Sequence, residues 1–159
     1  MQIKAITDED FVNYKLPSMF IGTATCTFKC DRECGRPVCQ NSELAAAPAI
    51  DISDDKIIRR YMKNPITKAI VFGGLEPFDQ AVELHEFVAK LRKKYHCDDT
   101  VVIYTGYSPD EITMELMAFA TLGNIVVKFG RYVPGHEPHY DEVLGVNLAS
   151  DNQYAKEIC

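Results

Sequence analysis

The stretch Ser18-Met-Phe-Ile-Gly-Thr-Ala-Thr25 is followed directly by Cys26-Thr-Phe-Lys-Cys30-Asp-Arg-Glu-Cys34-Gly-Arg-Pro-Val-Cys39-Gln-Asn41, which holds four of the chain's six cysteines. The apolar part predicts a β-strand whose carboxyl end leads into the cysteine loop. Open α/β sheets usually place their ligands at the carboxyl ends of their strands. Because thiolates are soft ligands that suit zinc and iron–sulfur centres, the loop indicates a metal or cluster site.

Length and composition limit what surrounds this loop. The 159 residues, 47% hydrophobic and 25% charged, predict a single domain over residues 1–159. Six cysteines are too few for a disulfide scaffold, and residues 1–10 lack the apolar core of a signal peptide, so we expect a cytoplasmic protein. No apolar run approaches the roughly 20 residues that cross a bilayer. A net charge of −6 disfavours a nucleic-acid partner.

Strands and helices are expected to alternate along the rest of the chain. Further strands are predicted at residues 68–73, 100–105, 124–129 and 146–148, with an edge strand or extended arm at 2–6. Helices are predicted from a Ser53 cap to Asn64-Pro65, over 79–95, and from Ser108 to about Ala120, with an irregular linker at 44–50 and a long loop at 130–145. This order predicts an α/β fold with an open, curved, mostly parallel sheet and helices on its outer face; four or five strands are too few to close an eight-stranded barrel.

A second motif, Gly73-Gly-Leu-Glu-Pro77, ends the strand expected at 68–73. Three thiolates leave one iron of a four-iron cluster without a protein ligand, and an open iron can bind and activate another molecule. Three of the cysteines together with this motif resemble the radical S-adenosylmethionine (SAM) enzymes. In that superfamily, three cysteines hold a 4Fe–4S cluster and the glycine-rich strand end contacts the methionine part of SAM.

Later segments narrow the resemblance. Val101-Val-Ile-Tyr-Thr-Gly-Tyr107, Phe129-Gly-Arg131 and Asn147-Leu-Ala-Ser-Asp-Asn-Gln153 look like segments of anaerobic ribonucleotide reductase activating proteins, over roughly residues 18–154. The resemblance implies a partial radical SAM barrel and a radical SAM oxidoreductase that cleaves SAM reductively to a 5′-deoxyadenosyl radical. It also implies a glycyl radical enzyme as partner and a reduced flavodoxin or ferredoxin-type protein as electron donor.

The resemblance also implies the site residues. The family spacing C-x3-C-x2-C, with an Asn two residues on, is altered here, so Cys34 and Cys39 compete as third ligand after Cys26 and Cys30. Cys39 needs a six-residue insertion but restores the following Asn and an apolar residue just before the ligand, so we favour it. The residues expected at SAM are Val38, Asn41, Gly73, Gly74, Glu76, Pro77, Thr105 and Gly106. No catalytic residue is expected beyond the cluster ligands.

The same residues also have simpler structural interpretations. All four loop cysteines could form a closed zinc site, and Gly73-Gly74 could be a simple turn that needs positive φ. His136-Glu-Pro-His139 is more typical of a solvated loop than of a metal pair. The alternative functions are a radical SAM enzyme that modifies a peptide or small molecule, and a non-catalytic iron–sulfur or zinc-binding module. For the activating function, we expect a large partner to dock over residues 130–145.

Overall fold

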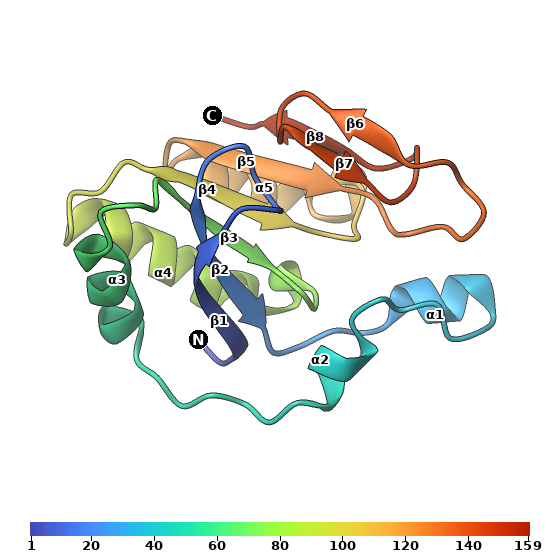
Figure 1. Cartoon of the computed structure of the whole chain (residues 1–159), viewed down its shortest axis with the longest axis horizontal. Coiled ribbons are helices and arrows are strands. Elements are labelled where there is room, and N and C mark those ends of the chain that lie inside the picture. Colours follow the sequence, from blue (N-terminus) through green and yellow to red (C-terminus); the bar gives the residue numbers. More distant parts are fainter.

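A computed structural model describes all of residues 1–159. Its main sheet has six strands in the order β1-β2-β3-β4-β5-β8, and the four central strands run parallel. These are β2 (Ser18–Thr23), β3 (Ala69–Gly73), β4 (Thr100–Tyr104) and β5 (Ile125–Phe129). The edge strands β1 (Ile3–Asp10) and β8 (Tyr154–Glu157) are antiparallel to their neighbours. The sheet is therefore mostly parallel and open, within the predicted α/β class (Figure 1).

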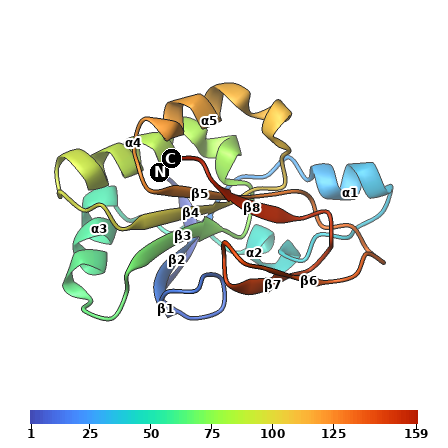
Figure 2. The ribbon, with the colours of Figure 1, turned by 90° about the horizontal axis from the view of Figure 1, so that it is seen from above.

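Three helices cover one face of this sheet (Figure 2). They are α3 (Asp54–Lys63), α4 (Ala81–Lys93) and α5 (Thr113–Ala120), and 3₁₀ turns η1 (Pro77–Gln80) and η2 (Pro109–Glu111) precede the last two. The Ser53 cap is confirmed, because its side chain accepts a hydrogen bond from the Lys56 N–H at 3.4 Å. Inward-facing strand residues such as Phe72 pack on helical residues such as Phe87, with ring centroids 5.2 Å apart.

The opposite face of the sheet carries a smaller core. A two-stranded sheet formed by β6 (His139–Asp141) and β7 (Val146–Leu148) brings Leu144 and Leu148 against the strand residues Val71, Val102 and Val126. In Figure 2 this small sheet lies across the main sheet from the long helices. It leaves the carboxyl ends of the parallel strands accessible beside it.

Four elements differ from the prediction. Strands β6 and β8 were not expected, because both are short; β8 pairs only with the edge of β5, and β6 pairs only with β7 in the separate two-stranded sheet. The cysteine loop contains α1 (Lys29–Cys34), and the expected irregular linker contains α2 (Ser42–Ala46). Neither helix has a buried residue, so neither shows the amphipathic period that would predict it. No helix has both the length and the apolar character needed to span a membrane.

Candidate iron–sulfur and cofactor site

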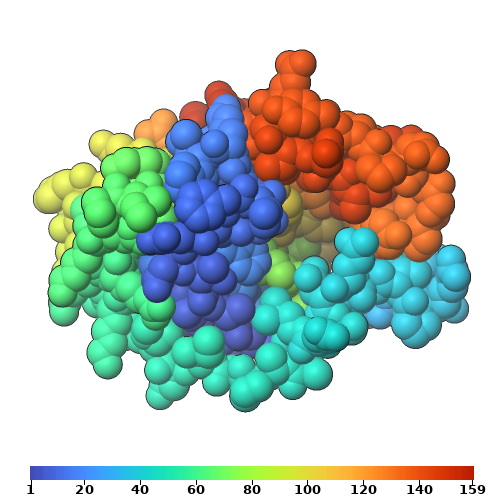
Figure 3. Space-filling view, viewed as in Figure 1, coloured from blue at the N-terminus to red at the C-terminus, as the bar shows by residue number.

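A cavity of about 460 Å³ lies over the carboxyl ends of β2 to β5. Figure 3 shows the molecule hollowed there, between the cyan cysteine segment (residues 26–41), the blue N-terminal strands and the orange-red C-terminal part. Small-molecule sites usually measure roughly 300–1,000 Å³. The predicted site residues in its lining are Cys26, Cys30, Val38, Cys39, Asn41, Gly73, Gly74, Glu76, Thr105 and Gly106. Cys34 and Pro77 are not in the lining; Pro77 is buried at the start of η1.

The cysteine segment brings three thiols to one wall of this cavity. All the cysteines are free, and no three Cys, His, Asp or Glu side chains are close enough together to form a metal site as they stand. The Asp31 Oδ1 accepts hydrogen bonds from the N–H groups of Val38 and Cys39, at 2.8 and 2.9 Å, which folds the end of the segment back towards α1. Cys39 is therefore held against Asp31, the chain neighbour of Cys30, although Asp31 and Cys39 are eight positions apart in the sequence.

Hydrogen bonds to sulfur support a ligand role for two of these thiols. The Phe28 N–H lies 3.2 Å from Cys26 Sγ, and the Asn41 N–H lies 3.4 Å from Cys39 Sγ. Such donors stabilise bound thiolates and tune the potential of a cluster. Burial raises the pKa of Cys26 to about 11, so a bound metal centre would have to stabilise its thiolate form. The soft donors and their N–H partners fit a 4Fe–4S cluster.

Polar contacts fix the start of the cysteine segment. Asp79 Oδ2 accepts a hydrogen bond from the Thr27 N–H at 2.8 Å, and its Oδ1 accepts one from the Tyr107 hydroxyl at 2.6 Å. The Lys29 ammonium lies 4.4 Å from the centre of the Tyr107 ring. Burial and the Asp79 hydrogen bond raise the pKa of Tyr107 to about 12, so its hydroxyl stays a donor at neutral pH.

A network of charged side chains around Glu111 and Arg131 holds α1 in place. Glu111, in η2, accepts hydrogen bonds from both terminal nitrogens of Arg131, at 2.7 and 3.0 Å, and from Lys29 at 3.2 Å. Arg131 also lies 3.4 Å from Glu33. The Arg131 guanidinium holds the pKa of Glu111 well below its usual range. Lys29 and Glu33 are both in α1, so Glu111 and Arg131 together anchor that helix beside the strand ends.

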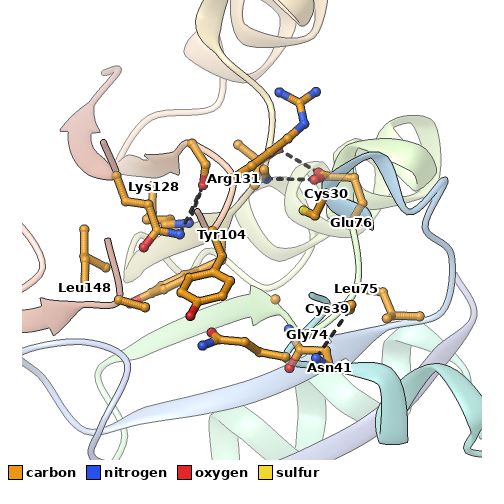
Figure 4. A pocket seen from close by; sticks show the side chains of 18 of the residues that line it. Cys30, Cys39, Asn41, Gly74, Leu75, Glu76, Tyr104, Lys128, Arg131 and Leu148 are labelled. Atoms are coloured by element: carbon orange, nitrogen blue, oxygen red, sulfur yellow. Dashed lines mark hydrogen bonds between the residues drawn. The ribbon is translucent and has the colours of Figure 1, made fainter. Parts of the chain in front are cut away.

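Glu76 organises the strand-end wall of the cavity, where it lies beside Cys30 (Figure 4). It is 8% exposed; its Oε1 accepts hydrogen bonds from the Phe78 N–H at 3.1 Å and the Thr105 hydroxyl at 2.7 Å, and its Oε2 accepts one from the Gly106 N–H at 2.8 Å. Burial raises the pKa of Glu76 above its ordinary value, against the effect of these donors. Since a carboxylate offers about four acceptor positions, one remains on Oε2 for a ligand.

Gly74 has a structural reason to be glycine. Its φ is +83°, and an added Cβ would lie 2.3 Å from Leu44 Cδ2. The same Leu44 methyl would lie 3.3 Å from a Cβ at Gly22. Leu44 of α2 therefore packs across two glycines, one in β2 and one in the turn after β3, and the turn interpretation of this motif accounts for Gly74 without a ligand.

The structure also describes the two histidines of the long loop, which is largely solvent-exposed as expected, and one lysine that the sequence did not single out. His136 Nδ1 bonds Asp151 at 2.7 Å and His139 Nε2 bonds the Gln153 carbonyl at 2.5 Å, so these imidazoles tie the long loop to the C-terminal tail. Lys128, in contrast, was not singled out from the sequence, yet it is 7% exposed and lines the cavity. The sequence feature that could have identified it is a lysine within a predicted strand whose other residues are apolar.

The fold and this site together define an α/β domain with a candidate cluster centre at the carboxyl edge of a mostly parallel sheet. A family model described as a 4Fe-4S single cluster domain matches residues 18–150. The chain belongs to that family, and it is an iron–sulfur protein. No curated protein and no solved structure matches the chain.

Proposed function

We propose that this protein is a radical SAM enzyme, with a partial radical SAM barrel, of the type that activates a glycyl radical enzyme. The supporting observation is that one cavity is lined both by the three thiols of Cys26, Cys30 and Cys39 and by the strand-end residues Gly73–Glu76 and Thr105–Gly106. A closed zinc site of four cysteines is less well supported, because Cys34 lies outside the cavity lining.

The residues of the chain have distinct roles in this proposal. Cys26, Cys30 and Cys39 hold the cluster, which when bound supplies the electron that cleaves SAM to methionine and a 5′-deoxyadenosyl radical. Glu76 accepts a hydrogen bond from the SAM ammonium at its free Oε2 position, and its bonds to Thr105 and Gly106 keep that wall rigid. The role of the remaining lining residues is to bind SAM and exclude water from the reaction.

The proposed partner is an anaerobic ribonucleotide reductase or similar glycyl radical enzyme, and the proposed electron donor is a reduced flavodoxin or ferredoxin-type protein. Residues 130–145 suit the contact with the partner. Tyr132 lines the cavity, whereas Tyr140 of β6 is 60% exposed. Tyrosines are enriched in protein interfaces, and this loop connects the cavity to the outer surface.

The enzyme proposal is tested by anaerobic reconstitution with iron and sulfide, followed by metal and sulfide analysis. Reduction in the presence of SAM should then release equal amounts of methionine and 5′-deoxyadenosine. Zinc in place of iron, or a complete cluster with no cleavage, would leave the binding-module alternative instead. A Cys34→Ala variant is the matched control for Cys39→Ala, because both remove one thiol from the same segment.

The partner proposal needs a separate measurement. The probe is Tyr140→Ala, a single substitution that leaves the backbone of β6 intact. The control is Tyr154→Ala, because Tyr154 is a tyrosine of β8 that is 44% exposed. Tyr140→Ala should reduce the glycyl radical signal in electron paramagnetic resonance while SAM cleavage is retained. An unchanged signal would remove this surface from the interface. No signal with any candidate reductase would favour the peptide or small-molecule substrate.

A further inference from the structure

The turn after β3 holds the residues that lead into the cysteine segment. Residues 24–27 follow β2 and belong to no strand or helix. Three hydrogen bonds tie them to the turn, from the Ala24 N–H to Gln80 Oε1 (2.8 Å), from the Glu76 N–H to the Thr25 carbonyl (2.9 Å), and from the Thr27 N–H to Asp79 Oδ2 (2.8 Å). The backbone is therefore held on both sides of Cys26.

Asp79 differs from the other two contacts because it meets the cysteine segment with a carboxylate. Each of its oxygens accepts one hydrogen bond: Oδ2 from the Thr27 N–H at 2.8 Å and Oδ1 from the Tyr107 hydroxyl at 2.6 Å. Asp79 is half-buried and forms no ion pair within 4.0 Å. A negative charge without a paired cation is thus fixed on the residue that follows Cys26.

A carboxylate at this position acts on a cluster site in two ways. By holding Thr27, it restricts the backbone beside Cys26, whose thiol lines the cavity. Through its charge, it opposes the negative charge that one-electron reduction adds to a cluster, because like charges repel strongly where water is partly excluded. The charge near an iron–sulfur cluster is one of the features that set its reduction potential, so the Asp79 carboxylate should lower that potential.

We propose that Asp79 is a positioning residue for the iron–sulfur cluster: it holds Cys26 in place for ligation, and its charge lowers the reduction potential of the cluster. This assignment rests on the ligand role of Cys26 in the proposed function. It also links the two walls of the cavity, because one turn carries Glu76 at the strand ends and Asp79 at the cysteine segment. A cluster of low potential suits the reductive cleavage of SAM, which uses the electron that the proposed donor protein supplies.

Two substitutions of Asp79 separate its contacts from its charge. Asp79→Asn removes the charge but can keep both contacts, since the amide oxygen accepts from the Thr27 N–H and the amide nitrogen can donate to the Tyr107 oxygen. It should keep its cluster and shift the reduction potential upwards, as measured by anaerobic redox titration of the reconstituted protein with detection by electron paramagnetic resonance. Asp79→Ala should in addition retain iron against a chelator roughly 10- to 100-fold less well, the usual cost of removing a group that orients a metal ligand.

Glu83→Gln is the matched control, because Glu83 is an exposed carboxylate in the first turn of α4 that takes part in no ion pair. It should change neither the potential nor the retention of iron. A wild-type potential in Asp79→Asn, or the same shift in Glu83→Gln, would overturn the effect of the charge.

The positioning role has its own contrary outcomes. Wild-type retention of iron in Asp79→Ala, or a loss in Asp79→Asn as large as that in Asp79→Ala, would overturn it. Cys26→Ala tests the ligand separately. A cluster kept by Cys26→Ala would refute the ligand set of the proposed function, whereas a cluster lost by Cys26→Ala but held normally by Asp79→Ala would refute only the role of Asp79.

Discussion

The two walls of the cavity are built in different ways. The cysteine segment contains α1 and leads into α2, and neither helix has a buried residue. The segment is fixed mainly by side-chain contacts such as those of Asp31 and Glu111. The strand-end wall contributes Glu76 and Thr105, which are 8% and 1% exposed and are joined by a 2.7 Å hydrogen bond. Core packing fixes one wall, whereas polar contacts at the surface hold the other.

This difference means that the strand ends are in place before a ligand binds, whereas the cysteine segment completes its folding when the metal binds. Parallel strands buried on both faces hold their carboxyl ends in place before a ligand arrives. A segment of thiols held at the surface gains its final geometry with the metal, because ligand binding and local folding are then a single process. Changes in the cysteine segment should therefore act on cluster content, and changes in the strand-end wall should act on the stability of the fold.

The largest expected effect is on cluster content. Cys26→Ala, Cys30→Ala and Cys39→Ala should each abolish iron binding, while Cys34→Ala should retain most of it, as measured by iron and sulfide analysis after reconstitution. The fold should survive in all four, because α1 and α2 contribute nothing to the core. Loss of the cluster in Cys34→Ala with retention in Cys39→Ala would reverse the choice of third ligand.

The next effect is on the strand-end wall. Glu76→Ala should lower the free energy of unfolding by about 2–4 kcal/mol, since it leaves buried donors on Thr105, Gly106 and Phe78 without their acceptor. Urea denaturation of the protein before reconstitution measures this directly. The matched variant Asp31→Ala, in the cysteine segment, should cost less. Equal losses for the two variants would contradict the distinction between the walls.

The third prediction concerns the packing of Leu44 against Gly74. Gly74→Ala should lower the free energy of unfolding by about 2–3 kcal/mol, through the positive φ and the overlap with Leu44. In a Leu44→Ala background the overlap disappears, and Gly74→Ala should then cost only the about 1–2 kcal/mol of a non-glycine residue at positive φ. A double-mutant cycle by denaturant titration should thus show coupling. Strict additivity would mean that α2 moves freely over the turn.

The smallest effect concerns pH. Since Arg131 lowers the pKa of Glu111 in the folded protein, this group stabilises the fold above its unfolded pKa of about 4.3 and loses that effect as the pH falls towards the lower folded value. Glu111→Gln should lower the melting temperature by about 2 °C at pH 7 and less at pH 3. Thermal melts over that range provide the measurement, and a difference that grows towards acid pH would contradict the sign.

The parallel strands and the start of α3 were predictable because their signals are local, whereas α4 and α5 begin at Ala81 and Thr113, after short 3₁₀ turns. Residues 69–73 form a run of apolar side chains, and Ser53 precedes an acidic first turn, as the sequence indicates. Strand β8 was missed because Tyr154-Ala-Lys-Glu157 has no alternating pattern and gains its pairing only from the edge of β5. The helices α1 and α2 were missed for a similar reason, since neither contributes a buried stripe.

The sequence by itself determined the chemistry that is available: thiols on one short segment, glycines and a carboxylate after one strand, and an alternating strand and helix order. The tertiary structure decided which of these groups face one another. It placed Cys39 rather than Cys34 in the cavity lining, put Leu44 across Gly74, and turned Lys128 towards the cavity as a buried cation without an ion pair. Residue types and periodicity are local properties, whereas burial and contact depend on strand register and on packing between segments far apart in the chain.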